Sequence, residues 1–146
     1  MHAATTPAPL TLEVLAESLS ICRLGADAPW PDWATRVGPF VSITRTADEL
    51  SVICPTALVP DVRAAGDDSS AITTSDEGWR AIKLVGPFAL TDVGILLRIA
   101  APLAAAGISI LAIGTFDTDY VLVKDSRLAA ALTELRRAGH VVVGAR

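Results

Sequence analysis

Residues 79–144 contain a regular alternation of strand-like and helix-like segments, and this pattern limits the folds that are open to the chain. Apolar residues recur at helical spacing in two segments, and short apolar runs lie before, between and after them. The predicted elements are a strand from Trp79, a helix over 92–106, strands over 108–113 and 120–124, a helix over 126–138 and a strand over 141–143. The two middle strands are rich in apolar residues, so we expect them to be central in the sheet.

The two predicted helices end at residues that are typical of helix termini. Asp92 is a candidate N-cap of the first helix, and Gly107 and Gly139 stand where the two helices should stop. Pro102 removes one backbone hydrogen bond inside the first helix, at a cost of roughly 3 kcal/mol unless packing favours a bend. The buried faces are formed by Ile95, Ile99, Leu103 and Ala106 in the first helix and by Leu128, Leu132 and Leu135 in the second.

Residues 10–63 carry a shorter version of the same plan. Strand-like runs over 10–24 precede a hairpin pattern over 40–55, and only one or two helical turns fit where the later module has full helices. The order strand, helix, strand, strand, helix, strand in residues 79–146 is the ferredoxin-like arrangement. We therefore predict an α+β fold of two ferredoxin-like βαββαβ modules packed side by side, the first of them degenerate, with an acidic linker over 64–78.

Charge and hydropathy exclude two classes of partner. The net charge is −4 and the basic residues are scattered, so we expect no nucleic-acid binding. The most hydrophobic run, 93–114, contains Arg98, Pro102 and Gly107, which favours a helix followed by a strand over a membrane span. We expect no membrane association.

The N-terminus and the cysteines indicate the compartment. The first residues lack the charged start and apolar stretch of a signal peptide, so we expect a cytoplasmic protein. Cys22 and Cys54 lie in apolar strand-like runs without a Cys-x-x-Cys spacing, which favours buried free thiols. Trp30 and Trp33 are expected to cap the core, with an aromatic wall for a ligand as the alternative.

Catalysis has little support in the sequence. Neither His2 nor His140 has a nearby nucleophile or metal partner, and no phosphate-binding or dinucleotide motif occurs. Asp92, Asp117 and Asp119 form the one candidate acid/base or Mg²⁺ group, although acids in such turns often serve as caps. We expect no enzyme activity and no cofactor.

The predicted start of the first long helix, residues 91–95, is a candidate binding site. Backbone N–H groups and the positive end of the helix dipole attract a carboxylate there, and Gly94 leaves room for it. Asp92 is able to satisfy the same N–H groups as a cap, which is the alternative interpretation. Thr115, Phe116 and Asp119 lie between two strands that the topology brings near this helix end. Together these residues suit a zwitterion, although a polar hairpin turn with Phe116 in the core remains the alternative.

Several motifs in residues 78–140 resemble the ACT domain, in the tandem-ACT subgroup that is similar to the CASTOR arginine sensors. They are Gly-Trp-Arg-Ala-Ile-Lys-Leu-Val-Gly-Pro-Phe, Val-Gly-Ile, Ile-Ala-Ala-Pro-Leu-Ala-Ala-Ala-Gly-Ile-Ser-Ile and Thr-Phe-Asp-Thr-Asp-Tyr-Val-Leu-Val-Lys. The resemblance implies an amino-acid effector bound between two ACT domains. The positions that match effector contacts are Thr91, Asp92, Val93, Gly94, Ile95, Thr115, Phe116 and Asp119.

The resemblance also implies how the chain would assemble and act. The sensors have four ACT units where this chain has two, which indicates a homodimer. Asp92 is shorter than the glutamate expected at its position, so the resemblance leaves the effector amino acid open. Our hypothesis is a stand-alone regulatory protein that an unidentified partner protein reads. A ligand-free protein-interaction module and a small carboxylate-dependent enzyme are the alternatives.

Overall fold

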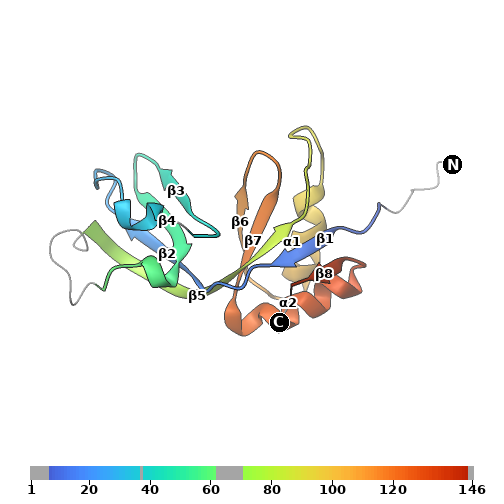
Figure 1. The fold of residues 1–146 in the computed structure, drawn as a ribbon. Helices are drawn as coiled ribbons and strands as arrows, with labels where there is room; N and C mark the ends of the chain where they lie inside the picture. The colour runs from blue at the N-terminus through green and yellow to red at the C-terminus, as the bar shows by residue number, and fades with distance from the viewer. Residues whose placement is uncertain (1–6, 37, 62–70, 145–146) are drawn as a thin grey trace.

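The computed structural model describes residues 7–36, 38–61 and 71–144, whose strands form one eight-stranded sheet. In chain order the elements are β1 (Thr11–Val14), β2 (Leu19–Leu24), the 3₁₀ helix η1 (Asp32–Thr35), β3 (Ser42–Arg45), β4 (Leu50–Pro55), η2 (Thr56–Leu58), β5 (Ile72–Leu84), α1 (Ile95–Ala105), β6 (Leu111–Gly114), β7 (Asp119–Lys124), α2 (Asp125–Arg137) and β8 (Val141–Val143). Figure 1 shows the two halves side by side, with α1 and α2 on the second. The predicted α+β fold of two ferredoxin-like modules is confirmed.

Strand β5 belongs to both modules. Its first part pairs with β2, from Ile72 opposite Leu24 to Trp79 opposite Leu19. From Trp79 onward β5 pairs with β7, and further along it also pairs with β1. The register shifts where the partner changes, and Gly78 adopts a φ of 81° there, which side-chain-bearing residues rarely do. The modules are therefore ordered β3-β4-β2-β5 and β8-β1-β5-β7-β6 within one sheet.

The segment predicted as an acidic linker over 64–78 has a different end in the structure. Residues 62–70 lie outside the described part of the chain, but β5 already begins at Ile72. Residues 73–77 pair with β2 and yet are exposed, because their polar side chains project from the sheet into solvent. Polarity alone therefore did not distinguish this extended strand from a loop.

Two strands lie elsewhere in the sheet than expected. β1, predicted with the first module, pairs with β5 and in parallel with β8, because Leu12 and Val14 are buried in the core under α1 and α2. β6 was expected to be central, but its pairing partner among the described residues is β7, so it forms an edge. Its apolar residues are instead covered by the first module, where Leu111 and Ile113 pack against the cluster of Leu19, Phe40 and Ile53.

Both helices of the second module end as predicted. Gly107 and Gly139 have φ values of 70° and 95°, and the following Ile108 and His140 donate backbone hydrogen bonds to the last turn. His140 is 7% exposed. Its Nδ1 accepts a hydrogen bond from the Leu10 N–H at 3.2 Å, and its Nε2 lies 3.3 Å from the Arg98 carbonyl oxygen. The imidazole thus joins the chain before β1 to α1.

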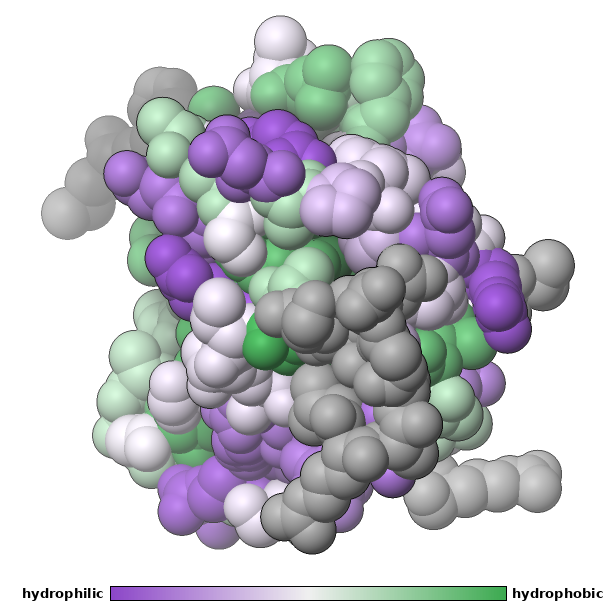
Figure 2. Space-filling view, turned by 90° about the vertical axis from the view of Figure 1, so that its left-hand side faces the viewer, coloured by the Kyte–Doolittle hydropathy of each residue, from purple (hydrophilic) through white to green (hydrophobic). Residues whose placement is uncertain are grey.

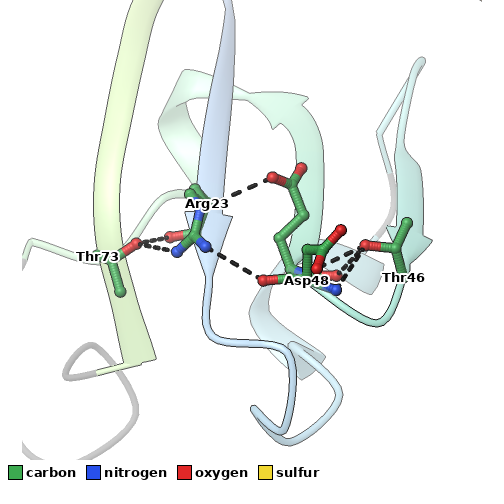
Figure 3. A network of polar contacts seen from close by, with 5 residues as sticks. Arg23, Thr46, Asp48 and Thr73 are labelled. Atoms are coloured by element: carbon green, nitrogen blue, oxygen red, sulfur yellow. Dashed lines mark hydrogen bonds and ion pairs between the residues drawn. The ribbon is translucent and has the colours of Figure 1, made fainter.

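The first module is held by strand pairing and a polar network rather than by long helices (Figure 3). Arg23 of β2 donates to the Thr73 hydroxyl at 3.2 Å and to the Asp48 carbonyl at 3.2 Å, and pairs with the Glu49 carboxylate at 3.7 Å. The Thr46 hydroxyl closes the β3–β4 turn by accepting from two backbone N–H groups. One arginine thereby connects β2 with the β3–β4 turn and with β5.

The tryptophans and cysteines of the first module can be compared with their predicted positions. Seen from the first-module end, hydrophilic and hydrophobic residues are interspersed (Figure 2). Trp33 packs on the module's core, whereas Trp30 is 53% exposed. Cys22 and Cys54 are buried free thiols, as predicted, and burial raises their pKa values from 9.0 to about 11 and about 12.

The described helices fall short of the length and hydrophobicity that a membrane crossing requires.

Candidate functional site

A groove of ≈ 410 Å³ lies between the start of α1 and the β6–β7 turn. Two segments form it: the loop from β5 into α1, and the turn that joins β6 to β7. Its lining residues are Phe88, Ala89, Leu90, Asp92, Gly94, Ile95, Leu96, Leu97, Thr115, Phe116, Asp117, Thr118 and Asp119.

The structure brings most of the predicted contact residues together in this groove. Six of them line it, namely Asp92, Gly94, Ile95, Thr115, Phe116 and Asp119. Thr91 and Val93 do not, and the Val93 side chain is 94% exposed on the rim. Residues 88–90, Leu96, Leu97 and Thr118 also line the groove and were not predicted from the sequence. The apolar residues among them gave no signal that separates a groove wall from a core.

The helix start differs from the prediction. α1 begins at Ile95, and its N-cap is Gly94, with a φ of 78° and no side-chain hydrogen bond. Asp92 does not cap the helix: its carboxylate accepts the Ala89 N–H at 2.9 Å and closes a turn in the preceding loop. The left-handed glycine turns the chain between this loop and the helix, which separates the aspartate from the helix end.

The first turn of α1 has unused hydrogen-bond donors. The Arg98 N–H donates to the Gly94 carbonyl at 3.3 Å, which is the first hydrogen bond of the helix. The N–H groups of residues 95–97 have no acceptor in the part of the chain that the structure describes. Free N–H groups together with the helix dipole form a site that favours an anion.

The opposite wall is a tightly bonded turn. The Thr115 N–H and hydroxyl donate to the Thr118 carbonyl at 2.8 and 2.9 Å. The Asp117 carbonyl accepts the Phe88 N–H at 2.7 Å, and the Thr118 hydroxyl donates to the Leu84 carbonyl. These bonds tie the turn to the loop before α1, so both walls of the groove form one connected unit.

Charge in the groove is negative. Asp92, Asp117 and Asp119 line it, and its described lining contains no basic side chain. Within the described ranges no group of three or more His, Cys, Asp or Glu residues is arranged to hold a metal ion. A ligand that balances these carboxylates carries positive charge.

The rim of the groove is apolar and open. Phe116 was weighed as a core residue, but its side chain is 78% exposed. Leu90, Val93 and Leu97 are 71%, 94% and 66% exposed on the facing side. We call these four residues the apolar rim. Large exposed apolar side chains around a polar groove are typical of a surface that another molecule covers.

Comparison with known proteins relates parts of this chain to known domains. Residues 74–137 match the model of the ACT domain, and residues 17–62 match a model of an N-terminal domain. The human cytosolic arginine sensor for mTORC1 subunit 1 is 38% identical over 72 residues, which are 47% of this chain and 22% of the sensor. The mouse protein is 29% identical over 100 residues, 68% of this chain and 29% of the sensor. The chain thus spans less than a third of these relatives.

Solved structures extend the similarity to most of the chain. Protein Atu0741 from Agobacterium tumefaciens is 37% identical, with a TM-score of 0.80 over 94% of both chains. The regulatory subunit of aspartate kinase from Thermus thermophilus shares the fold at 11% identity, with a TM-score of 0.60 over 87% of this chain and 96% of that one. The match to the domain model and the shared fold agree with the order of strands and helices. The chain thus contains an ACT domain over residues 74–137, and its second half is similar to the arginine sensors.

Proposed function

We propose that this chain is a regulatory protein that binds a free amino acid in the groove between α1 and the β6–β7 turn. The observation that carries the proposal is the uncapped start of α1 beside three carboxylates in one groove. The N–H groups of residues 95–97 suit the ligand's α-carboxylate, and Asp119 suits its α-ammonium group. Gly94 leaves this approach free of a side chain.

The effector that we propose has a cationic side chain. An α-amino acid brings one carboxylate for the helix and one ammonium for Asp119, which leaves Asp92 and Asp117 without a counter-charge. A guanidinium or a second ammonium group supplies it. The similar proteins are named as arginine sensors, which supports arginine as the first candidate and lysine as the second.

A second copy of the chain completes the site in this proposal. The apolar rim leaves Phe116 and Val93 in solvent, and covering them would exclude water from the groove and strengthen its polar contacts. A homodimer whose rims meet would therefore be stabilised by the effector. A partner protein would read the change in assembly.

The direct test is calorimetric titration of the full chain with each of the twenty amino acids. Arginine is expected to bind most tightly, and Asp119→Asn to weaken it by about tenfold or more through loss of a charge-assisted contact. Asp27→Asn, an exposed carboxylate in the first module, is the matched control and should bind like wild type. Absence of heat with every amino acid, in folded protein, would remove the effector proposal.

The apolar rim also favours a second candidate, a protein-interaction module without a ligand. This candidate predicts a stable complex whose affinity does not change when amino acids are added. A carboxylate-dependent enzyme has weaker support, because Asp92 is already engaged with the Ala89 N–H.

A further inference from the structure

A second groove, of ≈ 390 Å³, lies beyond the β6–β7 turn from the effector groove. Lys83 of β5 and Tyr120 of β7 line it from the sheet, where they stand opposite each other in register. Ile82 and Leu84 are buried under α1 and α2, so the intervening Lys83 belongs to the sheet face away from the helices. The other lining residues are Val85, Gly86, Pro87, Thr115, Asp117 and Thr118.

The incomplete first module explains why this face is open. Its cluster around Leu19, Phe40 and Ile53 covers the face over Trp79 and Ala81. The cover reaches Tyr120, whose ring lies 4.8 Å from the Phe40 ring. Lys83 is opposite Tyr120 and follows Ala81 on the same face of the sheet, one step further along β5 than the residues in the cluster. The groove is therefore the part of the sheet face that the first module leaves uncovered.

The walls of this groove are fixed in place. A Cβ atom on Gly86 would lie 2.8 Å from the Asp117 carbonyl oxygen, so the loop after β5 touches the β6–β7 turn directly. The Phe88 N–H and the Thr118 hydroxyl bond across the same junction. A groove between segments bonded in this way is preformed, so that little entropy is lost in ordering the protein when a ligand binds.

The polar groups in the groove have free hydrogen-bonding capacity. Lys83 is half-buried, and neither a hydrogen bond nor an ion pair engages its ammonium group within the described residues. Glu13 is its neighbour in register on β1, but no ion pair joins the two in this part of the chain. The Tyr120 hydroxyl is likewise without a described partner. Two donors without acceptors side by side suit a carboxylate.

We propose that this groove binds a small zwitterionic carboxylate, with its carboxylate on Lys83 and Tyr120 and its ammonium group on Asp117. The charged groups among the described lining residues of the effector groove are all carboxylates, whereas this groove combines a cation with one carboxylate. Its ligand therefore differs in charge arrangement from the effector. Asp117 lines both grooves, so the two ligands would share this carboxylate, whereas the contacts with Lys83 and Tyr120 do not depend on the effector proposal.

The test is an NMR titration of ¹⁵N-labelled full-length protein with β-alanine and with propionate. Both are expected to shift the amide signals of Lys83, Val85 and Tyr120 to saturation, and β-alanine to bind more tightly because propionate has no group for Asp117. Lys83→Met should weaken both ligands by about tenfold, and Tyr120→Phe by about threefold. Asp117→Asn should bring β-alanine to the affinity of propionate.

Two control variants distinguish this site from general surface charge and from the effector groove. Arg136→Gln removes an exposed cation from α2 and should leave both affinities unchanged. Asp119→Asn alters the effector groove alone and should leave β-alanine binding intact. Shifts that do not saturate, or that persist in Lys83→Met, would overturn the proposal. Loss of β-alanine binding in Asp119→Asn would place the ligand in the effector groove and would also contradict it.

Discussion

The two modules share a strand order but differ in their helices. The second has helices of 11 and 13 residues, where the first has 3₁₀ turns of 4 and 3 residues. The first still keeps the strand order β3-β4-β2-β5. The corresponding order in the second module is β6-β7-β5, followed by β1 and β8. Antiparallel pairing to the shared strand β5 is thus enough to hold a module whose helices are nearly gone.

The same difference separates the two modules in binding capacity. The cavity beside η1 has a volume of ≈ 110 Å³, against ≈ 410 Å³ beside α1. A single 3₁₀ turn has a small dipole, and the N-cap of η1 is Pro31 rather than a glycine that leaves room for a ligand. The larger groove of the second module thus lies beside a full helix, and the smaller cavity of the first lies beside a single 3₁₀ turn.

The largest expected effect concerns cooperativity between the modules. Leu103→Ala in α1 and Leu50→Ala in β4 each empty a fully buried site and should lower the free energy of unfolding by about 2–5 kcal/mol. Because β5 belongs to both modules, each variant should unfold in a single urea transition detected by both circular dichroism and tryptophan fluorescence. Two separate transitions would show that the modules are independent.

Thiol labelling sharpens the comparison, since both cysteines lie in the first module. Burial raises the pKa of Cys22 from 9.0 to about 11, so its thiolate fraction at pH 8 is about a hundredfold lower than that of a free thiol. In the native protein, the cysteines should therefore react with a thiol reagent only after the first module opens. When the two variants are compared at equal free energy of unfolding, Leu50→Ala should accelerate labelling of the cysteines more than Leu103→Ala. Equal labelling rates would mean that the cysteines become accessible only when the whole protein unfolds.

His140 provides a test confined to the second module. His140→Phe removes the partners of the Leu10 N–H and the Arg98 carbonyl and should destabilise the fold by about 1–3 kcal/mol. Hydrogen exchange should show the largest loss of protection in β1 and β8. Protection lost equally in β3 and β4 would argue against this local role.

The smallest expected effect is a pH dependence at the joint between the modules. The hydrogen bond and charge of Lys124 lower the pKa of Asp76 below 3.8. Because the pKa of Asp76 is lower in the folded than in the unfolded state, its interaction with Lys124 stabilises the fold at pH values above the unfolded-state pKa. This stabilisation is lost as the pH falls through the folded-state pKa of Asp76. Urea unfolding of Lys124→Met should show a weaker loss of stability on acidification than wild type. An unchanged acid profile would contradict the assignment.

Several features of the candidate site were predictable because they depend on local chemistry. Gly94, Thr115, Phe116 and Asp119 were identified from a glycine at a helix start and from polar residues between two strands, and the fold brings them into one groove. The role of Asp92 was not predictable, because a capping aspartate and one that closes the preceding turn occur in the same sequence context. Their contact with an effector stays a prediction.

The sequence alone determined where each helix ends, which residues alternate on the strands and that two related modules follow one another. Glycines at 107 and 139 and periodic apolar residues act within a few residues of themselves, so their signals are local. Only the tertiary structure decided that β5 serves both modules, that β1 joins the second and that β6 is an edge. Strand partners are chosen by burial among segments far apart in the chain, and the strand sequence does not encode that choice.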